Sequence, residues 1–326
     1  MPLTKVQSRG TENVGQGSSN VIINGAMNVS QRATSATGLG ASNGYFTCDR
    51  WHLTLQHTAG RLTATQDSSA PSGFANSLKL DCTTADTSIA SGEQIILQQR
   101  IEGQNLQAFA KGTSDAKPFA LSFYVKGNAS ATYVVGLYDN DNSRYVASTF
   151  NVTTDWTRVE VNFPADTTGA LNDDNASSLE LWIWLHSGST YTSGTLPSSW
   201  TSGSNSIYAG GLSTSFFDST DRTFFITGVQ LEVGSQASDF QHEDFGTSLR
   251  KCQRYYQVLG SEFNPNGSDG YSRVISYYKT QMRANPTFTQ VGGSGTLQDA
   301  DVHRVYLFAS GTGSTIGDGS NVDAEL

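Results

Sequence analysis

The sequence predicts an all-β protein, with an antiparallel β-sandwich, one short linking helix and a small C-terminal β domain. Between residues 21 and 245, short runs of alternating apolar and polar residues recur, which is the two-residue period of half-buried strands. Clusters of Gly, Asn, Ser and Thr separate these runs and supply the positive φ angles and side-chain hydrogen bonds of turns. Many short strands separated by turns are typical of antiparallel sandwiches.

The alternation is clearest in a set of short runs along the first part of the chain. They are Leu78–Asp81, Gln94–Gln99, Ala120–Lys126, Tyr133–Tyr138, Thr157–Phe163, Leu179–His186 and Thr223–Val233. In Ala120–Lys126, Leu, Phe and Val occupy every second position, so one face of that strand is apolar. We expect such faces to form the core of the sandwich.

These patterns divide the chain into three segments. Residues 1–20 form a polar arm without a hydrophobic period, and residues 21–245 form the sandwich. Residues 246–326 then form the linking helix and the C-terminal domain, and the helix is capped by Asp244 or Thr247. The helix is predicted from residues at helical spacing, which are Leu249, Cys252, Tyr255 and Tyr256.

The C-terminal domain should contain a few strands and a tail. The predicted strands are Arg273–Tyr278, Thr287–Val291 and His303–Ala309. Residues 310–326 are rich in Gly and acidic residues, so they are expected to form an extended tail.

Composition argues against several classes of partner. The net charge is −9 without a basic cluster, so no nucleic acid is expected, because phosphate binding needs concentrated Lys and Arg. No apolar run approaches the roughly 20 residues of a membrane span, and the first residues do not resemble a secretory signal. The three cysteines lack metal spacing and are expected to be reduced, buried thiols. The five histidines also lack ligand spacing, so no metal or other cofactor is expected.

Catalytic signatures are weak. No Gly-x-Ser-x-Gly elbow occurs, so no nucleophile for acyl transfer is evident. Two acidic pairs, Asp139/Asp141 and Asp173/Asp174, could act as the carboxylates of a glycosidase, but both lie in Asn-rich turns. Turn formation is the favoured role for them, and the chain is predicted not to be an enzyme.

The run Leu179–His186 carries the main candidate binding residues. Its Leu and Ile side chains share the core face, so Trp182 and Trp184 lie on the opposite face with His186. Two tryptophans left in water would expose a large apolar area, so something should cover them. Either a second layer packs over them, or they form a platform on which sugar rings stack.

A long Ser/Gly/Thr-rich segment, Ser187–Arg222, follows this strand. It contains Tyr191, Trp200 and Tyr208, and loops of this length are often functional. Rigid aromatic rings among small polar residues resemble a recognition surface, but the same residues could pack over Trp182 and Trp184. The candidate glycan-binding residues are therefore Trp182, Trp184, Tyr191, Trp200 and Tyr208.

A set of stretches resembles a known class of proteins. They are Val21–Arg32, Cys48–Trp51, Ile226–Ser235, Cys252–Tyr256, Lys279–Thr287 and Asp323–Leu326. In this order they resemble phage tail-fibre and virion structural proteins, and the opening also resembles carbohydrate-binding-module jelly rolls. The resemblance implies a jelly roll for the sandwich.

The resemblance also implies structural roles. Asn24 and Gly25 would form the first turn, Trp51 would pack in the core, and Gly228–Glu232 would belong to the closing strand. Cys252, Tyr255 and Tyr256 would likewise be structural. Such modules often hold calcium between acidic residues of the first and last strands, where this chain has Met27-Asn28 and Gly228-Val229.

The implied function is attachment. The chain would be a homotrimeric fibre or tail subunit of the virion, bound to other virion proteins through residues 1–20 and to host surface polysaccharide through many weak contacts. A capsid decoration or connector subunit with a purely structural role is the alternative, and a glycan-degrading tailspike enzyme is a third. Attachment predicts that Tyr191 and Trp200 are exposed, whereas decoration predicts that subunit contacts bury them.

Overall fold

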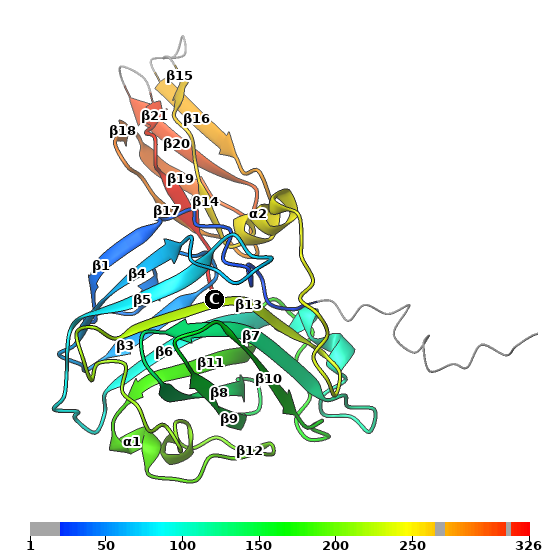
Figure 1. The fold of residues 1–326 in the computed structure, drawn as a ribbon. Helices are drawn as coiled ribbons and strands as arrows, with labels where there is room; N and C mark the ends of the chain where they lie inside the picture. Colours follow the sequence, from blue (N-terminus) through cyan, green and yellow to red (C-terminus); the bar gives the residue numbers. More distant parts are fainter. Residues whose placement is uncertain (1–19, 265–270, 311–313) are drawn as a thin grey trace, which may run out of the picture.

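The chain forms a two-layer β-sandwich from which a smaller β domain projects, as the computed structural model shows (Figure 1). The structure describes residues 20–264, 271–310 and 314–326. The predicted arm therefore lies almost entirely outside the described residues. The all-β jelly-roll class is confirmed, because the described residues form antiparallel sheets and very little helix.

The sandwich consists of a six-stranded and a seven-stranded sheet. The six-stranded sheet has the order β1 (Ser35–Leu39), β4 (Arg61–Asp67), β5 (Ser77–Thr84), β13 (Thr223–Val233), β7 (Phe119–Gly127) and β10 (Thr157–Phe163). The seven-stranded sheet has the order β12 (Thr201–Ser202), β9 (Arg144–Val152), β8 (Ala131–Asp139), β11 (Ser177–Ser187), β6 (Gln94–Glu102), β3 (His52–Gln56) and β2 (Gly44–Tyr45). Short helical turns connect some strands, namely η2 (Gly103–Asn105), η3 (Gln107–Phe109), α1 (Ser189–Thr192) and η4 (Asn205–Ile207).

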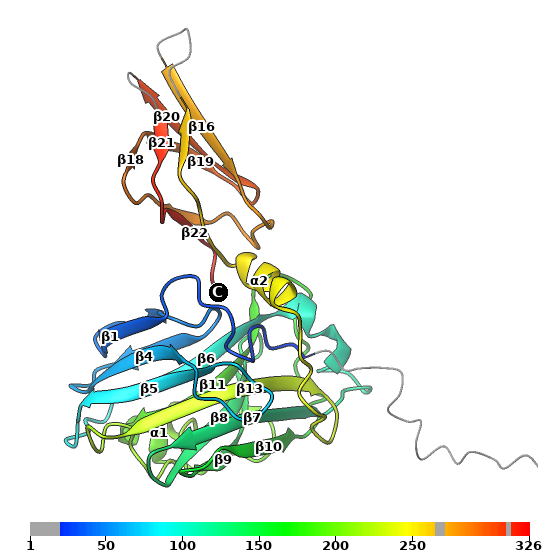
Figure 2. The same cartoon turned by 45° about the horizontal axis from the view of Figure 1, so that its top comes forward.

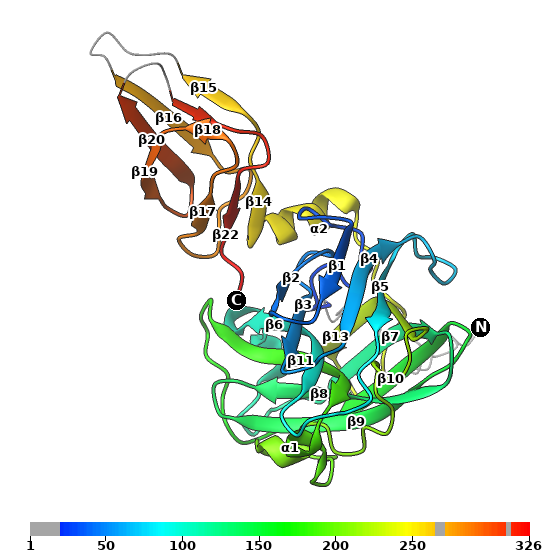
Figure 3. The same cartoon turned by 90° about the vertical axis from the view of Figure 1, so that its left-hand side faces the viewer.

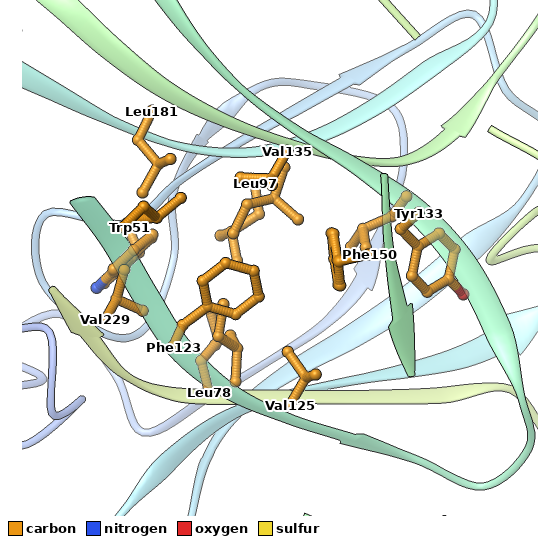
Figure 4. Close-up of a cluster of buried hydrophobic side chains, with 14 of the residues drawn as sticks. Trp51, Leu78, Leu97, Phe123, Val125, Tyr133, Val135, Phe150, Leu181 and Val229 are labelled. Atoms are coloured by element: carbon orange, nitrogen blue, oxygen red, sulfur yellow. The ribbon is translucent and has the colours of Figure 1, made fainter. Parts of the chain in front are cut away.

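The predicted alternation builds the core between the two sheets. Leu121, Phe123 and Val125 of β7 are fully buried, as are Leu181 and Ile183 of β11 on the opposite sheet. Figure 4 shows such side chains from both sheets meeting in the middle. Since burial of one large apolar side chain contributes about 1.5–3 kcal/mol, this layer is the main source of stability.

The first turn packs against the closing strand, as the resemblance implied. Asn24 adopts φ 57°, and its side chain donates to the carbonyl oxygens of Val29 (2.8 Å) and Asp49 (3.0 Å). A Cβ atom on Gly25 would lie 2.1 Å from the carbonyl oxygen of Val229, so this close approach requires glycine. Trp51 is buried, and its indole N–H donates to the Asn24 carbonyl.

The closing strand β13 bends at Gly228. This residue has φ 62° at a register shift in the pairing with β7, and a Cβ there would lie 2.7 Å from the Phe74 ring. Glu232, further along, is buried and accepts hydrogen bonds from the backbone N–H (2.6 Å) and hydroxyl (2.9 Å) of Ser238. Both residues therefore hold the end of the sandwich in place.

The linking helix α2 (Phe245–Gln253) begins at Asp244, whose side chain accepts from the backbone N–H of Thr247 at 3.0 Å. Of the two caps considered, Asp244 is the one used. Figure 2 shows α2 between the sandwich and the C-terminal domain. Cys252 is buried where the helix ends.

Three small antiparallel sheets make up the C-terminal domain (Figure 3). Their strand orders are β14 (Tyr256–Val258), β22 (Asn321–Asp323), β17 (Thr287–Thr289); β15 (Glu262–Asn264), β21 (Ser314–Ile316), β18 (Gly293–Ser294); and β16 (Tyr271–Tyr277), β20 (Arg304–Ser310), β19 (Thr296–Ala300). A separate core of Val274, Val305, Leu307 and Val322 holds them together.

The expectation of an extended tail was wrong for residues 314–326. β21 pairs with β15 and β18, and β22 lies between β14 and β17. The reason is that Ile316 and Val322 are buried and complete the core of the C-terminal domain. Residues 311–313 of the predicted tail lie outside the described residues.

A buried cluster joins the two domains, and we call Arg32, Arg50, Tyr255, Tyr256 and Glu325 the junction cluster. The Glu325 carboxylate is bound by the guanidinium groups of Arg50 and Arg32, and the side chains of Arg50 and Glu325 are only 1% and 5% exposed. Arg50 lies over the Tyr255 ring at 3.5 Å, and Arg32 lies over the Tyr256 ring at 3.7 Å.

A second buried carboxylate reinforces this junction. Glu102, at the end of β6, is bound by Arg254 at 3.0 Å and by Arg283 at 3.5 Å. In addition, the Gln31 side chain donates to the Tyr256 carbonyl at 2.8 Å. Almost every one of the sequence stretches that resemble virion proteins thus contributes a residue to this junction. These stretches therefore have a physical role, which is to fix one domain on the other.

Removal of Arg50 tests this role. Arg50→Ala leaves the Glu325 carboxylate buried with less compensation, so we expect a loss of about 3–5 kcal/mol in the free energy of unfolding. Urea denaturation followed by fluorescence measures this loss. The matched control is Lys251→Ala, which breaks the exposed pair with Glu243 and should cost less than about 1 kcal/mol. Equal losses in the two variants would contradict a central role for the junction cluster.

Candidate functional site

The outer face of the seven-stranded sheet holds Trp182 and Trp184, and the segment 188–212, which contains α1 and β12, packs over part of it (Figure 1). Trp184 is 1% exposed and packs against Tyr191, with ring centroids 5.3 Å apart. Ile96, Val134 and Ala209 belong to the same apolar cluster. A second layer therefore covers Trp184, which leaves no ring face for a sugar.

Trp200 lies elsewhere and is also buried. Its indole N–H donates to the Pro164 carbonyl at 2.8 Å, and its ring packs 5.6 Å from Phe119 in the main core. The Lys111 ammonium lies 4.9 Å from the same ring. The expectation that Trp200 is exposed was wrong, because the segment folds back and inserts this ring between the sheets within the same chain.

Three half-buried rings, Tyr138, Trp182 and Tyr208, form what we call the aromatic shelf. Trp182 and Tyr138 are stacked, with centroids 4.5 Å apart and an interplanar angle of 12°. Tyr208 meets Trp182 edge-on at 5.3 Å, and the Tyr145 hydroxyl donates to the Tyr208 carbonyl at 2.7 Å. Burial raises the pKa of Tyr208 to about 12, so its hydroxyl keeps its proton.

A row of hydrogen-bonded polar side chains borders the shelf, and we call Gln98, Arg100 and Glu180 the polar strip. The Trp182 indole N–H donates to Glu180 at 2.7 Å, and Glu180 lies 3.7 Å from Arg100. With its amide oxygen toward Arg100, Gln98 accepts from that guanidinium at 3.0 and 3.1 Å and donates to the Thr54 hydroxyl at 3.3 Å.

The register of β6 against β11 places the strip beside the shelf. Gln98 is opposite Trp182, and Arg100 is opposite Glu180. Sequence reasoning identified the strand Gln94–Gln99 but did not select these side chains. The sequence did contain a signal for them, because polar residues recur at alternate positions of β6 and Glu180 shares the face of Trp182 on β11. The pairing of β6 with β11, however, could not be predicted from the sequence.

A groove of about 410 Å³ lies between the facing strands β9 and β10. Polar side chains such as Asn151, Glu160 and Asn162 line it, while the rings of Phe150 and Phe163 beneath are buried. The groove therefore offers hydrogen bonds without an exposed ring, unlike the aromatic shelf.

The two acidic pairs have structural partners. Asp139 is fully buried and paired with Lys111, and it also accepts from the Asn142 backbone N–H at 2.9 Å. Asp141 accepts from the Asn172 side chain at 3.0 Å. Asp174 accepts from the backbone of Ala176, two residues on, which is an Asx turn. Turn formation and ion pairing thus account for these three carboxylates.

Sequence reasoning missed a buried relay at His186. Nε2 of this ring lies 2.9 Å from Glu93, and Nδ1 lies 2.7 Å from the Ser215 hydroxyl. The order resembles a hydrolase triad, but the Ser215 oxygen already accepts from the Phe217 N–H, and the Phe216 N–H donates to a strand carbonyl. Neither of these amides is available to an oxyanion, so the relay serves to fasten β11 to the loop that carries Ser215.

Within the described ranges, no three His, Cys, Asp or Glu side chains are grouped closely enough to hold a metal ion. In the same residues, no helix has the length and apolar character needed to cross a membrane. The three cysteines are free and buried.

Comparison with solved structures finds jelly-roll modules. A family 4 carbohydrate-binding module is 15% identical over 65% of this chain and 98% of the module, with a TM-score of 0.34. The family 11 module of Clostridium thermocellum, solved with a mixed-linked tetrasaccharide, is 10% identical over 63% of this chain and 99% of the module, with a TM-score of 0.31.

A phage protein is also similar. The bacteriophage CBA120 tailspike protein 4 domain is 14% identical over 66% of this chain, with a TM-score of 0.32, and the match spans 21% of the tailspike domain. No protein-family model matches, and no curated protein matches. The jelly-roll assignment rests on the chain's own strand order and core.

The outer face also contains a titratable group, His52, beside Gln98. Burial lowers the pKa of His52 to about 4 from 6.5, and the nearby Arg100 charge adds to the effect. The unfolded chain therefore binds a proton first as the pH falls, so stability present above pH 6.5 is lost between about 6.5 and 4.

We expect this loss to reach up to about 3 kcal/mol in the wild type. His52→Asn removes the titration, so the variant should lose that much less stability over the same pH range. Urea denaturation at a series of pH values compares the two proteins. Parallel stability curves would contradict the burial of a neutral His52.

Proposed function

We propose that this chain is a non-catalytic subunit of a bacteriophage particle that binds host surface glycans at the aromatic shelf. The observation that supports this proposal is the geometry at Trp182, which is half-buried, stacked on Tyr138 and hydrogen-bonded to Glu180. The ring is thereby held rigidly at the border of a polar strip, rather than lying free on the surface.

This arrangement suits the two-sided chemistry of a sugar. The C–H face of a pyranose is apolar and packs on an aromatic ring, while its hydroxyl groups need donors and acceptors at the edge. Arg100 supplies donors and Glu180 supplies acceptors, while the buried Gln98 holds the Arg100 guanidinium in position. Because these side chains already hold one another, little conformational entropy is lost when a ligand binds.

Weak single sites are compatible with attachment when copies are linked. A site of about millimolar affinity contributes about 4 kcal/mol, and linkage of copies can raise the overall affinity by roughly 10²–10⁴. We infer that the subunit belongs to a homotrimeric fibre or tail structure of the virion, with residues 1–20 toward the particle. The order of the sequence stretches that resemble virion proteins supports this part of the proposal.

A capsid decoration or connector subunit is the second candidate. Trp184 and Trp200 are buried by residues of the same chain, so these two rings contact neither a glycan nor a neighbouring subunit and do not separate the two candidates. Under this alternative the aromatic shelf contacts another virion protein instead of a glycan.

Substitution of Trp182 tests the shelf. We expect Trp182→Ala to weaken binding of labelled chain to a glycan array by at least about tenfold, since about 1.4 kcal/mol of ring contact is lost. Trp156→Ala is the matched control, because Trp156 is also half-buried but packs on Phe225 of the other sheet. This control should bind as the wild type does.

Circular dichroism and thermal unfolding verify that both variants are folded. Equal binding by the two folded variants would remove the shelf as the glycan site. Failure of the folded wild-type chain to bind any glycan or any host cell would favour the decoration or connector role.

A further inference from the structure

One face of the C-terminal domain exposes large apolar side chains. On β16, Tyr277 is 69% exposed, Tyr271 is 43% exposed and Ile275 is 40% exposed, and all three point to the same side of the strand. Alternate residues such as Val274 point inward to the domain core. Figure 3 shows β16, β20 and β19 as a sheet on the part of the domain away from the sandwich. Grouped exposed apolar residues of this kind mark interaction sites.

Cross-strand register extends this face over the neighbouring strands. Ile275 is opposite Tyr306 of β20, and Tyr306 is opposite Asp299 of β19. In the next row, Arg273 is opposite Phe308, and the guanidinium of Arg273 lies 5.7 Å from the Phe308 ring. The face therefore has an apolar centre and charged residues at both edges.

The composition favours a protein partner over a sugar. Sugars stack on flat rings, whereas this face includes the aliphatic Ile275 on β16, whose branched side chain needs an apolar partner. An apolar centre with Tyr and Arg and with a charged rim is the usual anatomy of a protein–protein interface.

The charges indicate which protein. The β16 edge carries Arg273 and continues into Lys279, whereas the β19 edge carries the exposed Asp299. Since the chain has a net charge of −9, two copies repel one another unless opposite charges meet. If the β16 edge of one copy meets the β19 edge of another, opposite charges are paired and the apolar centres are covered.

We propose that the β16–β20–β19 face binds the same face of a second copy of this chain about a two-fold axis, so that β16 of each copy lies over β19 of the other. A face that meets the same face of another copy forms an isologous contact, which joins the copies in pairs. The proposal goes beyond the homotrimer proposed above, because a pairwise contact is a further association of the chain.

The size of the face sets the strength of the contact. A seven-residue strand is roughly 23 Å long and three strands span roughly 14 Å, so the face covers about 300 Å². Standard interfaces bury about 800 Å² on each partner. Association of two copies through this face is therefore weak and depends on concentration.

The test compares two isoleucines of similar exposure in different domains. Ile275 on β16 is 40% exposed on this face, and Ile89 is 43% exposed in a loop of the sandwich. Sedimentation velocity of the full chain, from about 1 to about 100 μM, measures the mass. We expect wild type and Ile89→Glu to associate with rising concentration, and Ile275→Glu to stay monomeric.

Charge reversal separately tests the two-fold arrangement, in which the β16 edge of each copy meets the β19 edge of the other. Asp299→Arg should weaken association at least about tenfold, and the double variant Asp299→Arg with Arg273→Asp should restore it, because opposite charges meet again. A merely structural role for these residues would not produce this rescue.

Four outcomes would overturn the proposal. Association of Ile275→Glu equal to that of Ile89→Glu would show that copies assemble through another surface, with the multi-copy assembly intact. A monomeric wild type would overturn both the surface and the assembly, while glycan binding at Trp182 would remain a separate result. Loss of glycan binding by Ile275→Glu at unchanged mass would identify a sugar as the occupant. Absence of rescue by the double charge reversal would overturn the two-fold arrangement of the pair.

Discussion

The arrangement of the two domains depends on one buried ion pair, between Arg50 and Glu325. Both groups lose their hydration on folding, and the attraction between them offsets that loss only if the geometry and the surrounding partners are good. Arg32 supplies a second positive charge to the carboxylate, and the Tyr255 ring covers the Arg50 guanidinium. Arg50 also donates to the Arg100 carbonyl at 2.6 Å, so the junction borders the strand that carries the polar strip.

The second constraint is that the aromatic side chains on the outer face of the seven-stranded sheet must be shielded from water. Most of this area is removed from water by the segment 188–212, which contributes Tyr191 and Tyr208 and leaves the edge of the cluster half-buried. The shelf is rigid because it is the border of a packed layer. A platform made of isolated rings on a bare sheet would be mobile and would lose more entropy on binding. The same packing that removes Trp184 from any binding role thus fixes Trp182 in position for one.

The C-terminal domain differs from the sandwich in that its own chain does not cover the apolar residues of its outer sheet face. Its core is small, and its outer sheet leaves tyrosine and isoleucine in solvent, whereas the sandwich covers comparable residues with its own chain. A small sheet of three strands has little chain available to form a second layer. The apolar residues of its outer face are therefore available to a neighbouring molecule.

The sequence by itself determined the elements. The two-residue period located strands such as Ala120–Lys126, and the polar residues near the start of the helical pattern narrowed the cap to Asp244 or Thr247. Both are local properties, because alternation and capping depend on residues a few positions apart. The first turn at Asn24 and Gly25 could also be inferred, since its resemblance to known modules is carried by a short stretch.

Only the tertiary structure decided what covers each face. Alternation predicts that Trp182 and Trp184 share a face, but it does not predict that the segment 188–212 folds back to bury Trp184 and leaves Trp182 half-buried. In the same way, the burial of Trp200, the return of residues 314–326 into the C-terminal domain, and the placement of Arg100 beside Glu180 all depend on contacts between distant parts of the chain. Local patterns fix which side chains share a surface, whereas long-range packing and strand register fix the partner of that surface.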